Sequence, residues 1–97
     1  MAIRHSVAFA LRHEADSADE VSFLDAATAL AAIPGVERFE LLRETSAKND
    51  YRFALAMEFA DEATYRAYDS HPDHVAFVAQ RWVPEVTSFV EIDTVPV

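Results

Sequence analysis

A histidine and a tyrosine near residue 70 are the side chains best placed for proton transfer. Pro72 suits the first position of a helix, where its missing N–H costs nothing, so His74 falls in the first helical turn. The positive end of the helix dipole disfavours an imidazolium there and favours a neutral ring that accepts a proton at pH 7. Tyr68 lies six residues upstream and reaches the same place if the chain turns at His71. The spacing predicts an acid–base pair of His74 and Tyr68.

This pair has a chemical and a structural interpretation. In the chemical one, His74 removes a proton next to a carbonyl group and the Tyr68 hydroxyl stabilises the enolate that forms. In the structural one, both are half-buried polar groups that are satisfied by one another or by the backbone, and they fix the bend between two helices. His5 also has two interpretations. It lines a pocket together with His74 and Tyr68, or it is a core histidine bonded to a carbonyl group. The sequence is consistent with both interpretations in each case.

A metal site is not predicted. His71 and His74 are three residues apart, but Pro72 places His71 outside the helix and separates the two rings. The chain has no cysteine, which excludes disulfides, zinc–thiolate sites, iron–sulfur clusters and thiol nucleophiles. We expect no metal and no cofactor. A solvated acidic face is expected on the first helix instead, from Asp16, Asp19, Glu20 and Asp25.

The composition predicts one globular domain over residues 1–97. Hydrophobic residues make up 52% of the chain, which is enough for a single core. The net charge of −9 argues against nucleic acid and anionic membranes as partners, because both would repel it. The first eleven residues lack a continuous apolar run and no stretch has transmembrane length, so we expect a cytoplasmic protein.

Apolar patterns divide the chain into four strands and three helices. Ser17 and Glu20 form a capping box at the start of the first helix. Asp61 caps the second helix, Pro72 begins the third, and Pro84 is expected to end it. We expect strands at 3–11, 36–43, 51–59 and 86–95, and helices at 17–33, 61–70 and 72–83. This order predicts an α+β, ferredoxin-like antiparallel sheet with helices on one face.

The predicted strands have one bulky and one small side. The bulky side suits packing against helices, whereas alanines occupy the opposite side of the first and third strands: Ala8, Ala10, Ala54 and Ala56. Helices on one side of the sheet leave these alanines as an exposed apolar patch, and a second copy of the sheet would cover it. We therefore expect a homodimer through this sheet face.

Several segments together resemble the stress-responsive A/B barrel domain (Dabb) family of the dimeric α+β barrel group. They are His5 with Val7 and Phe9, Ile33-Pro34-Gly35-Val36, Arg43-Glu44-Thr45-Ser46, Lys48-Asn49-Asp50-Tyr51, Phe59, Tyr68, and His71-Pro72-Asp73-His74-Val75-Ala76-Phe77. The resemblance implies a dimer of ferredoxin-like chains whose sheets form a central barrel, with a pocket between each sheet and its helices.

One plant branch of this family, the olivetolic acid cyclases, closes a linear polyketide without a cofactor. By resemblance its catalytic tyrosine and histidine fall on Tyr68 and His74, and its first-strand histidine falls on His5. A pocket phenylalanine of that branch matches Phe23. Two positions depart from the branch, because its mid-sheet histidine aligns with Phe53 and a pocket tyrosine aligns with Ala26.

The resulting functional hypothesis is a small-molecule-binding domain with a pocket for a hydrophobic or aromatic ligand. If it is a cofactor-free cyclase or lyase, His74 is the base, Tyr68 the hydroxyl donor and His5 an orienting group. We expect the apolar wall of the pocket to consist of Phe23, Phe53, Leu55 and Trp82. The alternative is that these side chains are ordinary core residues that contact no ligand. Two other functions remain: a non-catalytic, stress-associated oligomeric protein, and a monooxygenase like those of related barrels.

Overall fold

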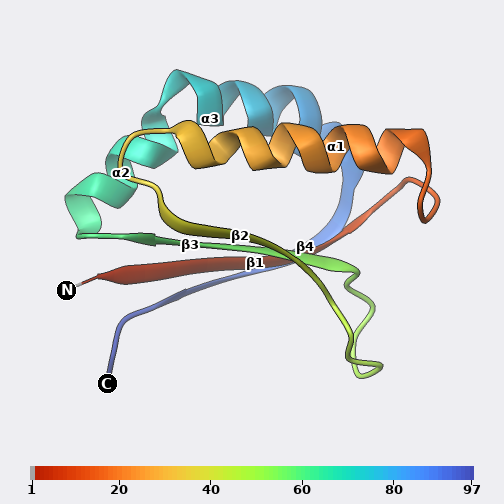
Figure 1. Ribbon diagram of the computed structural model, residues 1–97, viewed down its shortest axis with the longest axis horizontal. Helices are drawn as coiled ribbons and strands as arrows, with labels where there is room; N and C mark the ends of the chain where they lie inside the picture. Colours follow the sequence, from red (N-terminus) through yellow and green to blue (C-terminus); the bar gives the residue numbers. More distant parts are fainter. Residues whose placement is uncertain (1) are drawn as a thin grey trace.

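The computed structural model describes residues 2–97, and its four-stranded sheet is covered by helices on one side (Figure 1). The strands are β1 (Ile3–Leu11), β2 (Glu37–Arg43), β3 (Phe53–Phe59) and β4 (Val86–Thr94). The helices are α1 (Ala18–Thr28), α2 (Glu62–Ser70), α3 (Pro72–Phe77) and α4 (Val83–Glu85), with a 3-10 turn η1 (Ala29–Ala32) after α1 and a π-helical turn η2 (Val78–Trp82) between α3 and α4. All predicted elements are present.

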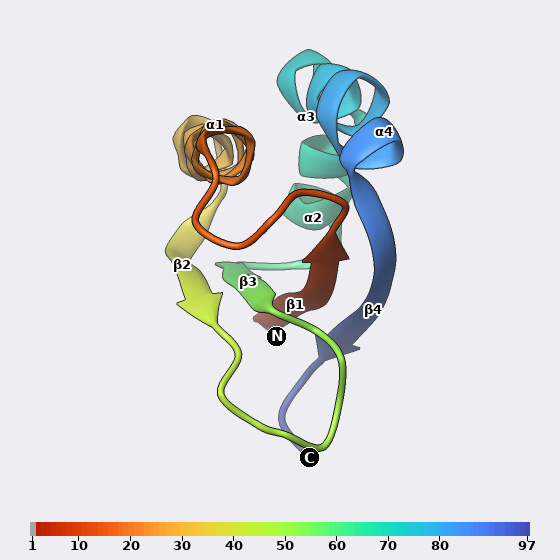
Figure 2. The same ribbon diagram turned by 90° about the vertical axis from the view of Figure 1, so that its right-hand side faces the viewer.

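The sheet has the order β2-β3-β1-β4, and every neighbouring pair of strands is antiparallel. Seen edge-on, all helices lie on one side of it and the other side is uncovered (Figure 2). The predicted α+β ferredoxin-like fold is therefore confirmed. Within residues 2–97, no helix is both long and apolar enough to cross a membrane.

The core lies between the helices and the bulky side of β1 and β3. Its largest fully buried apolar side chains are Phe9, Phe23, Phe53, Phe59 and Met57. The register sets Val7 of β1 opposite Leu55 of β3 and Glu91 of β4, so three strands present side chains at one level beneath the helices. This level contains the site described below.

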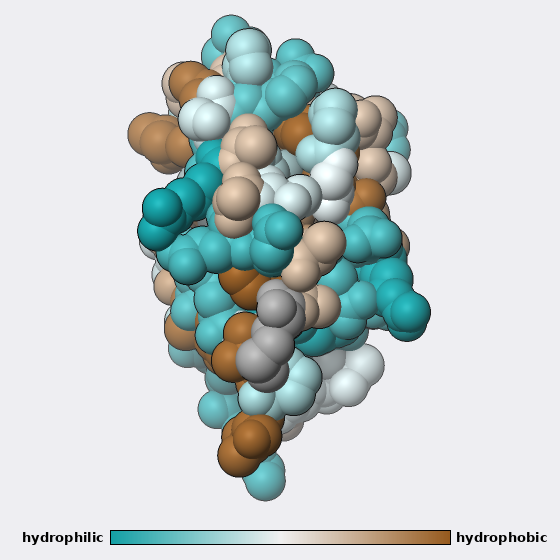
Figure 3. All heavy atoms as spheres, turned by 90° about the vertical axis from the view of Figure 1, so that its left-hand side faces the viewer, coloured by the Kyte–Doolittle hydropathy of each residue, from teal (hydrophilic) through white to brown (hydrophobic). Residues whose placement is uncertain are grey.

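The uncovered side of the sheet, here called the open face, is flat in the middle and apolar. Ala8 pairs with Ala54 on one side and with Val90 on the other. Larger apolar side chains flank the alanines and stay exposed, with Val90 at 38% and Ile92 at 54% of full exposure. Around the end that carries the N-terminus, apolar side chains lie in smaller groups among hydrophilic ones (Figure 3).

The start of α1 differs from the prediction in one respect. Ser17 accepts a hydrogen bond from the Glu20 N–H at 3.2 Å, as the capping box predicts. The Glu20 carboxylate, however, accepts from the Asp16 N–H at 2.9 Å and from Arg52 Nε at 3.0 Å, and it is only 2% exposed. The prediction of Glu20 on a solvated face was wrong, because Arg52 neutralises it and joins α1 to the sheet.

The last helical segment also extends further than predicted. Pro84 does not end it near Val83, since helical turns continue to Glu85. The Val83 N–H bonds the carbonyl of Val78, five residues back, which makes the π-helical turn. Pro84 then lies in the first turn of α4, where a missing N–H is tolerated.

Candidate functional site

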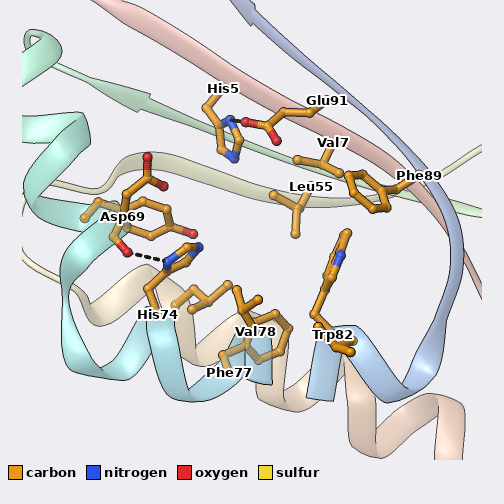
Figure 4. A pocket seen from close by; sticks show the side chains of 13 residues that line it. His5, Val7, Leu55, Asp69, His74, Phe77, Val78, Trp82, Phe89 and Glu91 are labelled. Carbon is orange, nitrogen blue, oxygen red and sulfur yellow. Dashed lines mark hydrogen bonds and ion pairs between the residues drawn. The ribbon is translucent and has the colours of Figure 1, made fainter. Parts of the chain in front are cut away.

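A cavity of about 360 Å³ lies between the helix-facing side of the sheet and the segment α2–α3–η2 (Figure 4). This volume is in the range of small-molecule sites. Apolar side chains form most of its wall: Val7, Leu55, Phe77, Val78, Trp82 and Phe89. The polar groups of the lining come from β1, β4 and the corner between α2 and α3.

The corner between α2 and α3 is fixed by His71. Its backbone N–H bonds the Tyr68 carbonyl at 3.1 Å and closes α2. Its Nδ1 accepts the Asp73 N–H at 3.1 Å and caps α3, which begins at Pro72 as predicted. This double cap orients Tyr68 and His74 toward the same cavity, and both line it.

His74 presents one nitrogen to the cavity. Its Nδ1 lies 2.9 Å from the backbone carbonyl oxygen of Asp69. A carbonyl oxygen only accepts, so Nδ1 carries the hydrogen, and in the neutral ring Nε2 keeps a lone pair. The ring edge opposite the Asp69 bond faces the cavity in Figure 4. The geometry suits a hydrogen-bond acceptor or a general base.

Tyr68 supplies a hydroxyl donor beside that ring. The two ring centroids are 4.5 Å apart, and Tyr68 is 2% exposed. Burial, and next the negative charges of Asp69 and Glu91, raise the pKa of Tyr68 above its ordinary value, so the hydroxyl stays protonated. The Tyr68 hydroxyl has no hydrogen-bond partner within residues 2–97. Every fully buried polar side-chain atom in these residues does have a partner, so the Tyr68 oxygen must retain some contact with solvent. The hydroxyl is therefore reached through the cavity, and His74 and Tyr68 do not satisfy one another.

His5 lines the cavity from the sheet, opposite the helices. Its Nδ1 lies 2.6 Å from Asp93 Oδ1 and 2.8 Å from the Tyr65 hydroxyl oxygen, and Tyr65 donates to Asp93 Oδ2 at 2.9 Å. Because a carboxylate accepts, Nδ1 carries the hydrogen, and in the neutral ring Nε2 is the acceptor. Figure 4 shows this second nitrogen directed into the cavity. The interpretation of a core histidine is right about burial, since His5 is 7% exposed, but the partner of its Nδ1 is a carboxylate and not a carbonyl.

Sequence reasoning missed Tyr65, Glu91 and Asp93. Glu91 Oε1 lies 3.1 Å from the Tyr65 hydroxyl, so it shares the single proton of that hydroxyl with Asp93, and it lies 3.7 Å from His5 Nδ1. Burial, then the hydrogen bond with Asp93 and the charges of Asp93 and Glu91, raise the pKa of Tyr65. Alternation along the last predicted strand was the available signal, because residues 91 and 93 share a face with each other and, in the paired sheet, with His5.

The His5, Glu91 and Asp93 cluster also brings three potential metal ligands within 4.8 Å of one another. The hydrogen-bond pattern uses them differently. His5 Nδ1 donates to Asp93, so a metal ion at this cluster would have to displace that proton. The arrangement fits a network that orients His5.

Two of the four predicted wall residues line the cavity and two do not. Leu55 and Trp82 form part of the wall. Phe23 is fully buried on α1, behind Phe77 and Trp82, with ring centroids 5.6 and 6.2 Å away. Phe53 is 1% exposed and packs on Phe9 at 5.9 Å. Phe23 and Phe53 therefore have the alternative role, as core residues that support the wall.

The sequence matches the family model of the stress responsive A/B barrel domain, Dabb, over residues 3–96. The chain belongs to this family. A Dabb family protein of Mesorhizobium loti with a ferredoxin-like fold is 57% identical to it. Their structures superpose with a TM-score of 0.96, covering 99% of this chain and 97% of that one. Among curated proteins, none matches the sequence.

More distant solved structures bear on assembly and on the fold. A dimeric ferredoxin-like protein of unknown function from Thermobifida fusca is 28% identical, with a TM-score of 0.82 over 99% of this chain and 92% of that one. A hydroxynitrile lyase from Passiflora edulis is 14% identical, with a TM-score of 0.86 over 99% and 94%. At that identity the lyase shows the shared fold alone. The description of such neighbours as dimeric supports a homodimer for this chain.

Proposed function

We propose that this Dabb domain binds a small hydrophobic molecule in its cavity and moves a proton on it without a cofactor, as a lyase or cyclase does. His74 Nε2 is the general base and the Tyr68 hydroxyl stabilises the oxyanion that forms. His5, held by Asp93 and Tyr65, orients the substrate from the sheet side. The single observation that carries the proposal is that the Nε2 edge of His74, which makes no hydrogen bond within residues 2–97, and the unpartnered Tyr68 hydroxyl line one apolar cavity.

The protonation states of the pair support this division of roles. Because the Tyr68 pKa is raised, the tyrosine is a donor and not a phenolate base. The Asp69 carbonyl holds the hydrogen on His74 Nδ1, so in the neutral ring the lone pair of Nε2 is on the cavity side. A general base placed in this way contributes roughly 10²- to 10⁴-fold to a rate. The Passiflora edulis protein of the same fold is named a hydroxynitrile lyase, so the fold is compatible with lyase chemistry.

The proposed assembly is a homodimer through the open face. The central pairs Ser6–Ala56 and Ala8–Ala54 leave that face flat, so a second sheet can approach closely. Exposed Leu42, at 41%, and Ile92, at 54%, would be covered at the same time. The cavity lies on the opposite side of the sheet and stays accessible in such a dimer.

An exchange experiment tests the base without knowledge of the natural substrate. The probe is 4-phenyl-2-butanone, a neutral aromatic ketone, incubated with the protein in D₂O while NMR follows loss of its α-protons. We expect the protein to accelerate exchange, His74→Ala to lose about 10²-fold of the acceleration, and Tyr68→Phe to lose about tenfold.

His13→Gln is the matched control, because His13 bonds Glu85 at 2.7 Å and does not line the cavity. It should exchange the probe at the wild-type rate. Equal exchange by wild type and His74→Ala would refute the role of His74.

The open face favours a second candidate, a non-catalytic oligomeric protein. In that case dimerisation is the function and the cavity pair is structural. The two candidates differ in a Tyr68→Phe/His74→Ala double variant. If wild type accelerates exchange and the double variant is an equally stable dimer without this activity, the result supports catalysis. If neither wild type nor the double variant accelerates exchange, the result supports the oligomeric role.

A further inference from the structure

The charged groups around the cavity have a single sign. Asp69 and Glu91 are part of the lining, and among the described lining residues none is lysine or arginine. Within residues 2–97 neither carboxylate forms a salt bridge with a lysine or arginine side chain. The Glu91 carboxylate lies 3.1 Å from the Tyr65 hydroxyl, whose proton it shares with Asp93, and 3.7 Å from His5 Nδ1. An anion that entered the cavity would meet two carboxylates and no permanent cation.

The side chain of Arg81, which adjoins Trp82 of the cavity wall in sequence, is directed elsewhere. Arg81 precedes Trp82 and is the only lysine or arginine between residues 72 and 85. Its Nε donates to Glu85 at 2.6 Å and its Nη2 to the Ser22 hydroxyl at 3.1 Å. Glu85 lies four residues after Arg81 on the same helical segment, and Arg81 does not line the cavity. Arg81 is therefore not available to bind a substrate carboxylate.

The cavity lining also has more hydrogen-bond acceptors than donors. In their neutral forms His5 and His74 each offer an Nε2 lone pair, and the two carboxylates accept as well. Among the described lining residues, the Tyr68 hydroxyl and the Trp82 indole N–H are the side-chain donors with no hydrogen-bond partner. A ligand that only accepts therefore finds two donors here, beside four acceptor groups. An ammonium group, which has three donors and no acceptor, finds several acceptors.

Aromatic rings complete this environment. Trp82, Phe89 and Phe77 all line the cavity. The ring centroid of Trp82 is 5.4 Å from that of Phe89, in an edge-on arrangement, and 6.4 Å from that of Phe77. The faces of such rings attract cations as well as apolar groups. The negative field reaches inward, because the charges of Asp69 and Glu91 contribute to the raised pKa of Tyr68.

We infer that the ligand of this cavity is a hydrophobic amine and that hydrophobic acids are rejected. The apolar body packs against Trp82 and Phe77, and the ammonium group lies toward Asp69 and Glu91. This inference rests on the proposed function and names the substrate class of the same site. The positive charge of the amine also offsets the repulsion that two carboxylates exert on an oxyanion formed beside Tyr68.

Three ligands with one skeleton test the inference: 4-phenylbutylamine, 4-phenyl-1-butanol and 4-phenylbutyrate, at pH 7.4. Trp82 is the single tryptophan of the chain and lines the cavity, so its fluorescence reports binding directly. We expect the amine to bind at least about fivefold more tightly than the alcohol, and the acid to bind most weakly. The preference for the amine should shrink between 0.05 and 0.5 M salt, because the carboxylates are exposed.

A double variant and a matched control separate local from global charge. Asp69→Asn/Glu91→Gln removes two negative charges from the cavity and should bring the amine within about twofold of the alcohol. Glu14→Gln/Asp25→Asn removes two charges from exposed positions outside the cavity and should keep the preference.

Equal binding of amine and alcohol by the wild type, or tightest binding of the acid, overturns the inference and leaves the proposed cavity function standing. If none of the three changes the Trp82 fluorescence or raises resistance to urea, the proposed function fails together with the inference.

Discussion

Two tyrosines one turn apart on α2 should respond differently when each loses its hydroxyl. The Tyr65 hydroxyl contacts His5 Nδ1 at 2.8 Å, Asp93 Oδ2 at 2.9 Å and Glu91 Oε1 at 3.1 Å. The Tyr68 hydroxyl has no partner within residues 2–97, although its ring is more deeply buried. The substitutions Tyr65→Phe and Tyr68→Phe are chemically identical, so each is the control for the other.

The expected magnitudes follow from these contacts. A hydrogen bond to a charged group contributes about 1.5–3 kcal/mol, but the side chains of Asp93 and Glu91 are 38% and 48% exposed, and solvent weakens the interaction. We expect Tyr65→Phe to cost about 1 kcal/mol of unfolding free energy, which is roughly 4–8 °C in Tm for a domain of this size. Tyr68→Phe removes no hydrogen bond within the chain and should stay within about 0.5 kcal/mol of wild type.

Calorimetric unfolding of both variants at one protein concentration measures the difference, and a fixed concentration is needed because the Tm of a dimer depends on it. The exchange assay with 4-phenyl-2-butanone should rank the variants in the opposite order, with Tyr68→Phe the more impaired. If Tyr68→Phe lowers Tm as much as Tyr65→Phe, the hydroxyl of Tyr68 supports the fold, and the argument that it serves a ligand is refuted.

Two further predictions concern the assembly and the buried ion pair. Ala8→Glu places a carboxylate in the centre of the open face, so sedimentation at micromolar concentration should give a monomer where wild type gives a dimer; a dimeric variant would contradict the sheet-face interface. Burial raises the pKa of Glu20, but hydrogen bonds from Arg52 and the Asp16 N–H, with nearby positive charge, lower it more. A lowered folded-state pKa gives stability that is present above the unfolded pKa and lost as pH falls. The difference in urea resistance between wild type and Glu20→Gln should therefore be largest near pH 7 and shrink below about pH 4, and a difference independent of pH would argue against this pairing.

The fold could be predicted from the sequence because local signals and packing requirements agree. Alternation in β1 and β3 set one bulky and one small side, and the structure buries the bulky one. The caps at Ser17 and Asp61 began helices where predicted. Pro84 was misjudged, because the π-helical turn before it depends on non-local packing and has no short sequence signal.

The candidate site was predicted in part. His5, Tyr68 and His74 all line one cavity, since a proline-defined helix start and strand alternation each fix a direction for a side chain. Phe23 and Phe53 were placed on the wall because composition and periodicity identify a buried aromatic residue without saying what stands in front of it. Glu91 and Asp93 were missed because carboxylates on an edge strand look like ordinary solvent-exposed residues until the register sets them beside His5.

The π-helical turn has a consequence for how this cavity can vary in shape. The Val83 N–H reaches back five residues to Val78, so the turn holds one residue more than an α-helical one. Each residue rotates a helix by about 100°, so deleting a single residue between Val78 and Trp82 would keep the segment helical but swing the indole off the cavity wall. The indole position could thus change through a one-residue length difference in this segment, while every strand pairing of the sheet stayed as it is.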